Sequence, residues 1–278
     1  MTSPSRVLAI LGLYSEDRPV WHTDEINEAL GYTRATGYRY VKDLVETGFL
    51  QKVSGGCYSL GARIIELDYQ LRRSDPILLA AVPVMDELVK KAKLDAVLTT
   101  MFGMKAVDTY RASIDPTLEL GYGRGRPRPL FMGAAPKVIL SCTPRPQLVK
   151  IYEAHAEEAA KHGLGTSWAD FRAYFAAVRK EGFYLSRGEL ERGVGGAAVP
   201  ILNADGEAAA ALALVGANES LDALGEPRMR SLLVRARGDI QARLVAGVDL
   251  PRARVALQEQ LREGSTQKGR HAAAGSKP

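Results

Sequence analysis

Polar side chains that can contact nucleic acid are concentrated in one short segment near the N-terminus. Between residues 33 and 47, Tyr38, Val41 and Leu44 recur at helical spacing, which predicts a helix with these residues facing inward. Thr33 can cap this helix, and the same spacing places Thr36, Arg39, Tyr40 and Lys42 on or beside its outward face. Arg34 lies near the buried stripe, and only its position in the first turn lets it reach outward. Arg, Thr and Tyr donate hydrogen bonds to base edges or phosphates, and the major groove admits a helix. The predicted DNA-contacting residues, including one from the hairpin that follows, are Thr33, Arg34, Thr36, Gly37, Arg39, Tyr40, Lys42 and Lys52.

The elements around this helix favour DNA binding over its alternative, a solvated polar face on a small packing module. Helical spacing over residues 7–14 and a short helix between Thr23 and Gly31 precede it. Two β-prone runs around Ser54-Gly55-Gly56 follow it as a hairpin. This order is typical of a winged helix-turn-helix. Asp43 and Glu46, near the same face, count against contact with a polyanion.

Residue patterns that carry catalysis or bind metal are scarce. The sequence contains no Gly-x-Ser-x-Gly elbow, His-Glu-x-x-His helix or phosphate-binding loop. The four histidines lack ligand spacing, and two cysteines, Cys57 and Cys142, make neither a disulfide framework nor a cysteine-rich zinc site. We therefore expect no enzyme, no metal and no cofactor. The alternative is a small hydrolase-like or scaffold protein with an accessory helical module.

Composition and charge bound the class of protein further. The 278 residues, 46% hydrophobic and 25% charged, are enough for two unequal domains. No apolar run is long enough to span a membrane, and no secretory signal is evident, so we expect a cytoplasmic protein without a membrane partner. The net charge of +5 says little about DNA, because residues 1–63 carry seven charges of each sign and residues 251–278 carry a net charge of +4.

The rest of the chain reads as a linker followed by an α+β domain. Residues 62–73 predict an amphipathic helix, whose apolar stripe packs either against a second copy or against the following domain. Beyond it, helical and β-prone runs alternate, and Asn203-Ala204-Asp205-Gly206 is a hairpin turn, which indicates an antiparallel sheet with helices. Strands are expected at 96–102, 106–112, 182–185, 197–202 and 208–215, and helices at 77–92, 137–141, 147–162, 168–181 and 222–245. The expected domains are 1–62, a linker helix 63–75, 76–250, and a flexible basic tail 251–278.

Three stretches together resemble the IclR family of bacterial transcriptional regulators over most of residues 6–247. The first comprises RVLAIL at 6–11, EINEALG at 25–31, TRATGYRY at 33–40, LVETGFL at 44–50 and YSLG at 58–61. The second is GRPRPLFMGAAPK at 125–137, and the third comprises VRKEGF at 178–183, Glu189 to Gly193, AVPI at 198–201 and Asp205-Gly206. The resemblance implies an α+β protein with an N-terminal winged helix-turn-helix, a linker helix and a GAF-like effector-binding domain. It also implies a homodimer or homotetramer on double-stranded (pseudo)palindromic operator DNA.

The resemblance also implies where a small-molecule effector binds. The matching positions are Met132, Gly133, Ala134, Ala135, Ser186, Gly196, Ala213 and Val215. The sequence departs from the family pattern at Ala135-Pro136-Lys137, where a small residue plus Gly-Lys is usual, and at Gly196, Ala213 and Val215, where Cys or Ser is frequent. The pocket is therefore expected to be roomier and less polar than in relatives.

Side chains near the second stretch could complete this pocket. Tyr110, Tyr122 and Phe131 could form an aromatic wall, and Arg111 could pair with a carboxylate. Arg124 and Arg126 are placed equally well in the pocket or in water, whereas Arg128 is expected on an exposed loop. With free N–H groups at a helix start, this set favours a small planar, aromatic acid or amide as effector. The resemblance implies a transcriptional regulator of a catabolic operon, which we expect to be a repressor, although the residues themselves do not distinguish repression from activation.

Overall fold

A computed structural model describes residues 2–114 and 124–247 of the chain. The predictions for Tyr122 and for the tail 251–278 lie outside these residues. The chain divides into two compact units between Ser74 and Asp75, and each has its own hydrophobic core.

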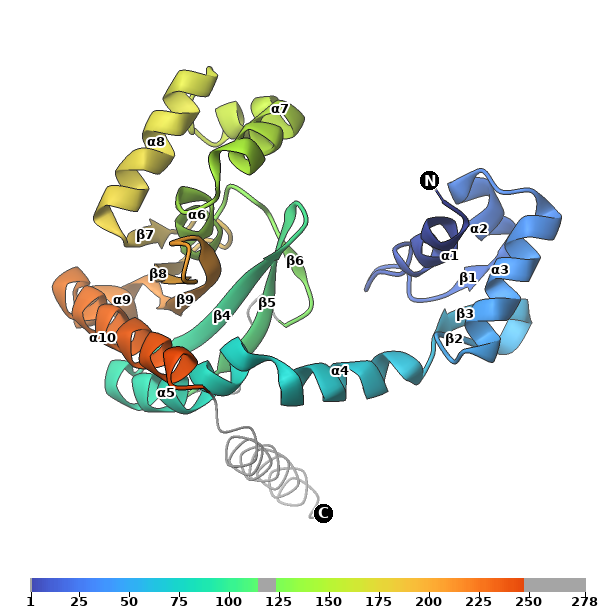
Figure 1. Ribbon diagram of the computed structural model, residues 1–278, viewed down its shortest axis with the longest axis horizontal. Coiled ribbons are helices and arrows are strands. Elements are labelled where there is room, and N and C mark those ends of the chain that lie inside the picture. Colours follow the sequence, from blue (N-terminus) through green and yellow to red (C-terminus); the bar gives the residue numbers. More distant parts are fainter. Residues whose placement is uncertain (1, 115–123, 248–278) are drawn as a thin grey trace, which may run out of the picture. The chain divides into compact units, whose positions relative to one another are not determined.

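The N-terminal unit is three helices and a small sheet, followed by a fourth helix (Figure 1). Its core is formed by side chains from all three helices and from the sheet, among them Ile10, Ile26, Leu44 and Leu50. The three strands pair antiparallel in the order β1-β3-β2, and the β2–β3 pair is the expected wing. The elements are α1 (Ser3–Leu11), β1 (Trp21–His22), α2 (Thr23–Leu30), α3 (Arg34–Glu46), β2 (Leu50–Lys52), a 3-10 turn (Ser54–Gly56), β3 (Cys57–Leu60) and α4 (Arg63–Ser74).

Local sequence sets the turn between α2 and α3. Gly31 ends α2 with φ of 65°, a left-handed conformation that costs a glycine little. Thr33 then caps α3, because its side-chain oxygen accepts a hydrogen bond from the Thr36 N–H at 3.3 Å. Two helices joined by so short a turn form the helix-turn-helix that the sequence predicted.

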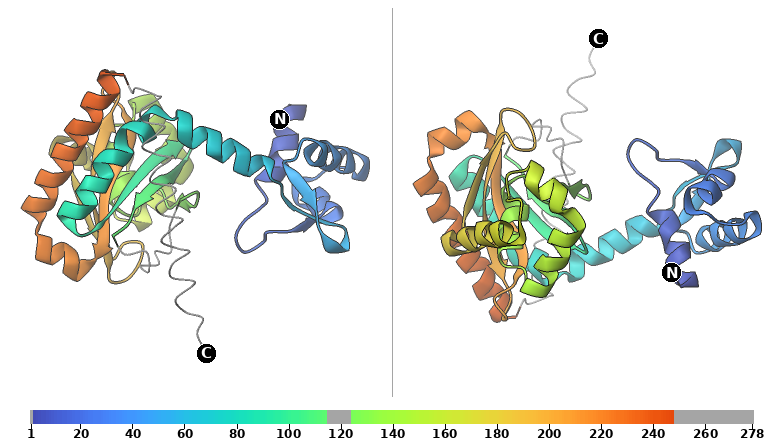
Figure 2. Two further views of the ribbon diagram at one scale, coloured as in Figure 1. Left: turned by 90° about the horizontal axis from the view of Figure 1, so that it is seen from below. Right: turned by 90° about the horizontal axis from the view of Figure 1, so that it is seen from above.

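The C-terminal unit is a six-stranded antiparallel sheet with helices on both faces (Figures 1 and 2). The strand order is β6-β5-β4-β9-β8-β7. The strands are β4 (Asp95–Phe102), β5 (Lys105–Ala112), β6 (Pro127–Arg128), β7 (Tyr184–Arg187), β8 (Val194–Leu202) and β9 (Ala208–Ala217). The helices are α5 (Pro76–Ala92), α6 (Ala134–Ser141), α7 (Arg145–Lys161), α8 (Trp168–Glu181), α9 (Asn218–Leu224) and α10 (Glu226–Val245). The single helix predicted over 222–245 is therefore two helices, separated at Gly225, whose φ is 78°.

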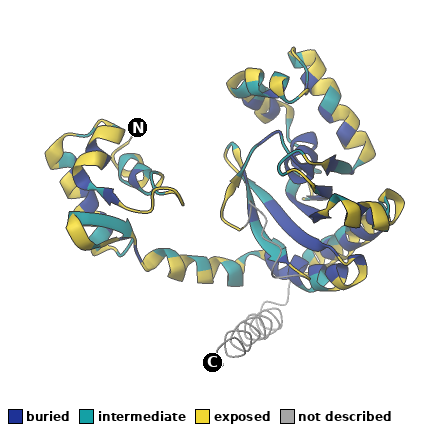
Figure 3. Cartoon of the chain, turned by 180° about the vertical axis from the view of Figure 1, so that it is seen from behind, coloured by how far each residue is buried: buried dark blue, intermediate teal, exposed yellow. Residues whose placement is uncertain are grey.

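Alternation along the central strands separates the two faces of this sheet. Leu212 and Leu214 of β9 pack into the core beneath α5 and α10, whereas Ala213 and Val215 face α6. Figure 3 shows the resulting burial of the central strands. Because the residues that face α6 are small, this face can hold a cavity.

A β-bulge changes the register between β4 and β5. Leu98 lies opposite Tyr110, but the next residue, Thr99, lies opposite Asp108, so Thr109 is the extra residue. Tyr110 therefore packs against the core under α5 and α10, while Asp108 lies on the other face with Thr99. The bulge therefore decides which of these two side chains lies on the face of the sheet that α6 covers.

Candidate functional site

The outward face of α3 carries a row of polar side chains. Arg34, Tyr38 and Lys42 follow one another at intervals of four residues, and Arg39 lies beside them, all exposed. Exposed pairs join Arg34 to Asp24 at 3.8 Å and Lys42 to Glu46 at 3.6 Å. Such exposed ion pairs contribute little, so these cations can exchange a carboxylate for a phosphate.

Two residues predicted to face DNA, Gly37 and Tyr40, are buried instead, because the buried stripe of α3 starts one residue earlier than the sequence indicated. It comprises Gly37, Tyr40, Val41 and Leu44. Tyr40 is 4% exposed and its hydroxyl is 3.2 Å from Ser3 Oγ, whereas Tyr38, predicted to face inward, is 42% exposed.

Gly37 is buried because α2 crosses α3 closely there. A Cβ at this position would lie 1.5 Å from Oδ1 of Asn27. Gly37 therefore positions the helix and has no side chain to offer DNA. Of the other predicted contacts, Thr36 is half-buried, whereas Thr33 is exposed and Lys52 is exposed at the end of β2 in the wing.

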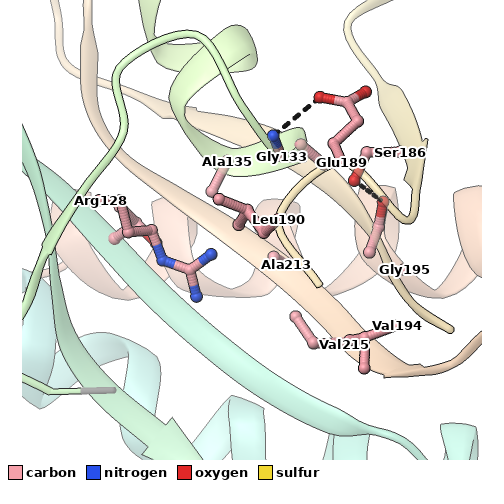
Figure 4. Close-up of a pocket in the computed structure, with 13 residues that line it drawn as sticks. Arg128, Gly133, Ala135, Ser186, Glu189, Leu190, Val194, Gly195, Ala213 and Val215 are labelled. Carbon is pink, nitrogen blue, oxygen red and sulfur yellow. Dashed lines mark hydrogen bonds between the residues drawn. The ribbon is translucent and has the colours of Figure 1, made fainter. Parts of the chain in front are cut away.

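A cavity lies between α6 and the face of the large sheet that α6 covers (Figure 4). Its free volume is about 40 Å³, room for a few water molecules but far below the volume of common ligand sites. Seven residues predicted for the effector site line it: Gly133, Ala134, Ala135, Ser186, Gly196, Ala213 and Val215.

Other predicted effector contacts do not reach this cavity. The bulge turns Tyr110 to the opposite face of the sheet, and Met132 is not among the lining residues. Nε of Arg111 donates to Asp95 Oδ2 at 2.7 Å instead. Phe131 is fully buried against Phe171, so it belongs to the core and forms no aromatic wall.

Sequence reasoning missed six lining residues, of which Arg128 is the most informative. Its side chain is 8% exposed, and its Nε donates to Asp108 at 2.7 Å, so the exposed loop expected for it is wrong. Figure 4 shows its guanidinium directed into the cavity. The bulge that brings Asp108 to this face could not be read from the sequence. The missed lining residues are Thr99, Arg128, Glu189, Leu190, Val194 and Gly195.

A second buried cation, Lys137 of α6, lies beside the cavity at 5% exposure of its side chain. Its Nζ donates to Glu189 Oε2 at 2.7 Å and to the Tyr184 hydroxyl at 2.9 Å, and the Tyr174 hydroxyl donates to Tyr184. Burial raises the pKa of both tyrosines, so both phenols stay neutral and can act as hydrogen-bond donors. This arrangement holds a carboxylate against a buried ammonium.

A larger hollow of about 400 Å³ lies between α5 and α10. Its charged lining residues, such as Glu87, Lys91 and Asp239, are exposed, so they do not form a buried polar site. Within residues 2–114 and 124–247, no group of three or more His, Cys, Asp or Glu could hold a metal ion. Over the same residues, no helix is both long and apolar enough to cross a membrane.

Comparisons with known proteins match both units. The family model described as IclR helix-turn-helix domain matches residues 3–54, and that described as Bacterial transcriptional regulator IclR C-terminal matches residues 70–242. The chain is 27% identical over 213 residues to the HTH-type transcriptional regulator KipR of Bacillus subtilis, covering 75% of this chain and 83% of KipR.

Solved structures share the fold. A crystal structure of an IclR-type regulator from Silicibacter has a TM-score of 0.72 at 23% identity, covering 87% of this chain and 96% of the other. An IclR homologue from Microbacterium hydrocarbonoxydans, complexed with 4-hydroxybenzoate, has a TM-score of 0.68 at 22% identity, covering 88% and 100%. The predicted α+β class, with an N-terminal helix-turn-helix and an antiparallel sheet, is confirmed.

Proposed function

The chain belongs to the IclR family of bacterial transcriptional regulators, and we propose that it represses a catabolic operon until a small organic acid binds in the cavity beside α6. In this proposal, residues 1–62 bind operator DNA, residues 63–75 link the domains, and residues 76–250 bind the effector. The regulator acts as a homodimer or homotetramer, because one helix in one groove buries too little surface to be specific.

The exposed face of α3 supports the DNA half of this proposal. Arg39 can reach a base edge or a phosphate, and Arg34 and Lys42 flank it. Tyr38 takes the outward position first assigned to Tyr40. Lys52 in the wing can contact an adjacent phosphate.

One observation supports the effector-binding part of this proposal. The side-chain carboxylate of Glu189 already lies in the wall of the cavity, where it is bound by the Gly133 N–H and by Lys137. The nearly buried guanidinium of Arg128, which is paired with Asp108, also lies in the wall of the cavity. A ligand that takes the place of the carboxylate on Lys137 must supply the counter-charge of this ammonium, so the site favours an anion over a neutral ligand. Aromatic monocarboxylates are the first candidates, because the Microbacterium homologue was crystallised with 4-hydroxybenzoate.

We predict that Arg39→Ala weakens binding to the DNA upstream of the protein's own gene. Losing one base or phosphate contact corresponds to about a 5- to 100-fold loss of affinity. Fluorescence anisotropy with a labelled duplex, at several salt concentrations, measures both the affinity and its salt slope. The matched control is Arg172→Ala, which removes an exposed arginine from α8. Equal affinities for the wild type, Arg39→Ala and Arg172→Ala would refute the assignment of α3.

A further inference from the structure

The loop between β7 and β8 fills the cavity with its own side chains. Glu189 and Leu190 both line the cavity, and the loop that carries them lies between Gly188 and Gly193. These two glycines have φ of 65° and 84°, conformations that other residues rarely adopt. The loop is therefore bounded on both sides by positions of unusual backbone freedom.

The carboxylate of Glu189 occupies the place best suited to an acid group. Its Oε2 accepts a hydrogen bond from the Gly133 N–H at 2.9 Å and another from Lys137 Nζ at 2.7 Å (Figure 4 shows the first). Its Oε1 accepts from the Tyr184 hydroxyl at 3.3 Å. A carboxylate with these partners satisfies the N–H of Gly133, the residue that caps the start of α6, and neutralises the buried ammonium.

Leu190 occupies the space next to this carboxylate. A Cβ added to Gly133 would lie 2.9 Å from Leu190 Cδ1, so Leu190 lies directly over the start of α6. Together with the free volume of about 40 Å³, this leaves no room for an aromatic acid. A ligand of that size can enter only when Glu189 and Leu190 leave.

We propose that Glu189 is an internal competitor of the effector, and that the effector's carboxylate replaces the Glu189 carboxylate on the Gly133 N–H and on Lys137. This inference rests on the proposed function, since it takes the effector to be an acid that binds this cavity. The exchange of one carboxylate for another keeps Lys137 paired. A neutral amide of the same shape would leave a buried ammonium without a counter-charge, so the exchange selects acids over amides.

The competition lowers the apparent affinity for the effector. When the open form is a minor population, the apparent dissociation constant is the intrinsic one divided by that population. Weakening the Glu189 contact enlarges the open population. We therefore expect Glu189→Gln to bind 4-hydroxybenzoate about tenfold more tightly than the wild type, and Leu190→Ala to bind it more tightly as well.

Calorimetric titration of the full chain with 4-hydroxybenzoate, and with 4-hydroxybenzamide, measures these affinities. Glu191→Gln is the matched control, because Glu191 belongs to the same loop but does not line the cavity. Its affinity should equal that of the wild type. An affinity of Glu189→Gln equal to or below that of the wild type would overturn the proposal, as would equal binding of the acid and the amide by the wild type.

A second arm uses formate and does not depend on the identity of the effector. Glu189→Ala leaves the carboxylate place empty, so 100 mM formate should raise its Tm by about 3 °C or more relative to chloride at the same ionic strength. The wild type, whose place is filled, should show no such difference. If Glu189→Ala folds only in formate, that result is the same rescue and supports the proposal. Equal effects of formate on the wild type and on Glu189→Ala would overturn it.

The two arms also separate this inference from the proposed function. If no acid releases any variant from DNA, the effector role fails. The formate measurement then still tests whether Glu189 competes with another carboxylate for the Gly133 N–H and Lys137. If acids release the wild type from DNA but formate does not distinguish Glu189→Ala, the regulator stands and the role of Glu189 fails.

Discussion

Some buried polar side chains of this protein have an ion-pair partner, whereas another has no hydrogen-bond partner among the described residues. Arg128 and Lys137 are nearly buried and each is paired with a carboxylate. The hydroxyl of Tyr14, in contrast, is buried without a hydrogen-bond partner among the described residues. Burial accordingly raises the pKa of Tyr14 from 10.0 to about 12. The folded N-terminal unit thus holds the Tyr14 proton more tightly than the unfolded chain does.

This group makes the stability of the N-terminal unit depend on alkaline pH. Because the pKa is higher in the folded state, the contribution is fully present below pH 10 and is lost as the pH rises from about 10 to about 12. Tyr14→Phe should flatten this loss. At pH 8 it should be neutral or stabilising by about 1 kcal/mol, because it removes an unsatisfied hydroxyl.

Urea unfolding of Tyr14→Phe at pH 8 and at pH 11 tests both statements. Tyr38→Phe, which removes an exposed hydroxyl from α3, serves as the control. Destabilisation of Tyr14→Phe by more than about 1 kcal/mol at pH 8 would mean that the hydroxyl has a partner after all.

At the scale of elements, the close crossing of α2 and α3 determines which side chains lie on the outward face of α3. We predict that Gly37→Ala destabilises the N-terminal unit by about 2 kcal/mol and weakens DNA binding, because the new methyl group would overlap the amide of Asn27. The double variant Asn27→Ala/Gly37→Ala removes the overlapping amide and should recover most of the loss. Chemical unfolding of both variants checks this, and a double variant no more stable than Gly37→Ala would contradict it.

Sequence periodicity predicted most helices and strands, but in α3 it did not predict correctly which residues face inward. The order of helices, the wing and the strand at Asp95–Phe102 follow from caps, turn residues and apolar spacing. The inward position of α3 at residue 37 is a glycine, which carries no hydrophobic signal, so the neighbouring Tyr38 was taken as buried. The packing of Gly37 against Asn27 of the neighbouring helix α2 decides which residues of α3 face inward.

The same limit applies to the cavity. Its small residues follow from the family resemblance, and seven of them line it. The bulge opposite Thr99 places Tyr110 and Asp108 on opposite faces of the sheet, and Arg128 is buried only because Asp108 then meets it. A single extra residue in one strand thus exchanged an expected aromatic contact for a buried ion pair, which no local pattern encodes.

At the scale of the whole molecule, the two units have separate cores, so regulation requires an energetic link between DNA binding and effector binding. A ligand shifts DNA affinity only by the difference in its affinity for the two states of the protein. By linkage, the factor by which an effector weakens DNA binding must equal the factor by which DNA weakens binding of that effector.

We predict a common factor of about 5- to 150-fold in the two directions. Titrating 4-hydroxybenzoate into the full chain, with and without saturating operator duplex, gives one factor, and titrating duplex with and without the acid gives the other. Arg39→Ala should bind the acid like the wild type when DNA is absent, because α3 and the cavity belong to different units. An acid that binds equally well with and without DNA occupies a site without control over the operator, and the protein would then be no regulator of that acid's catabolism.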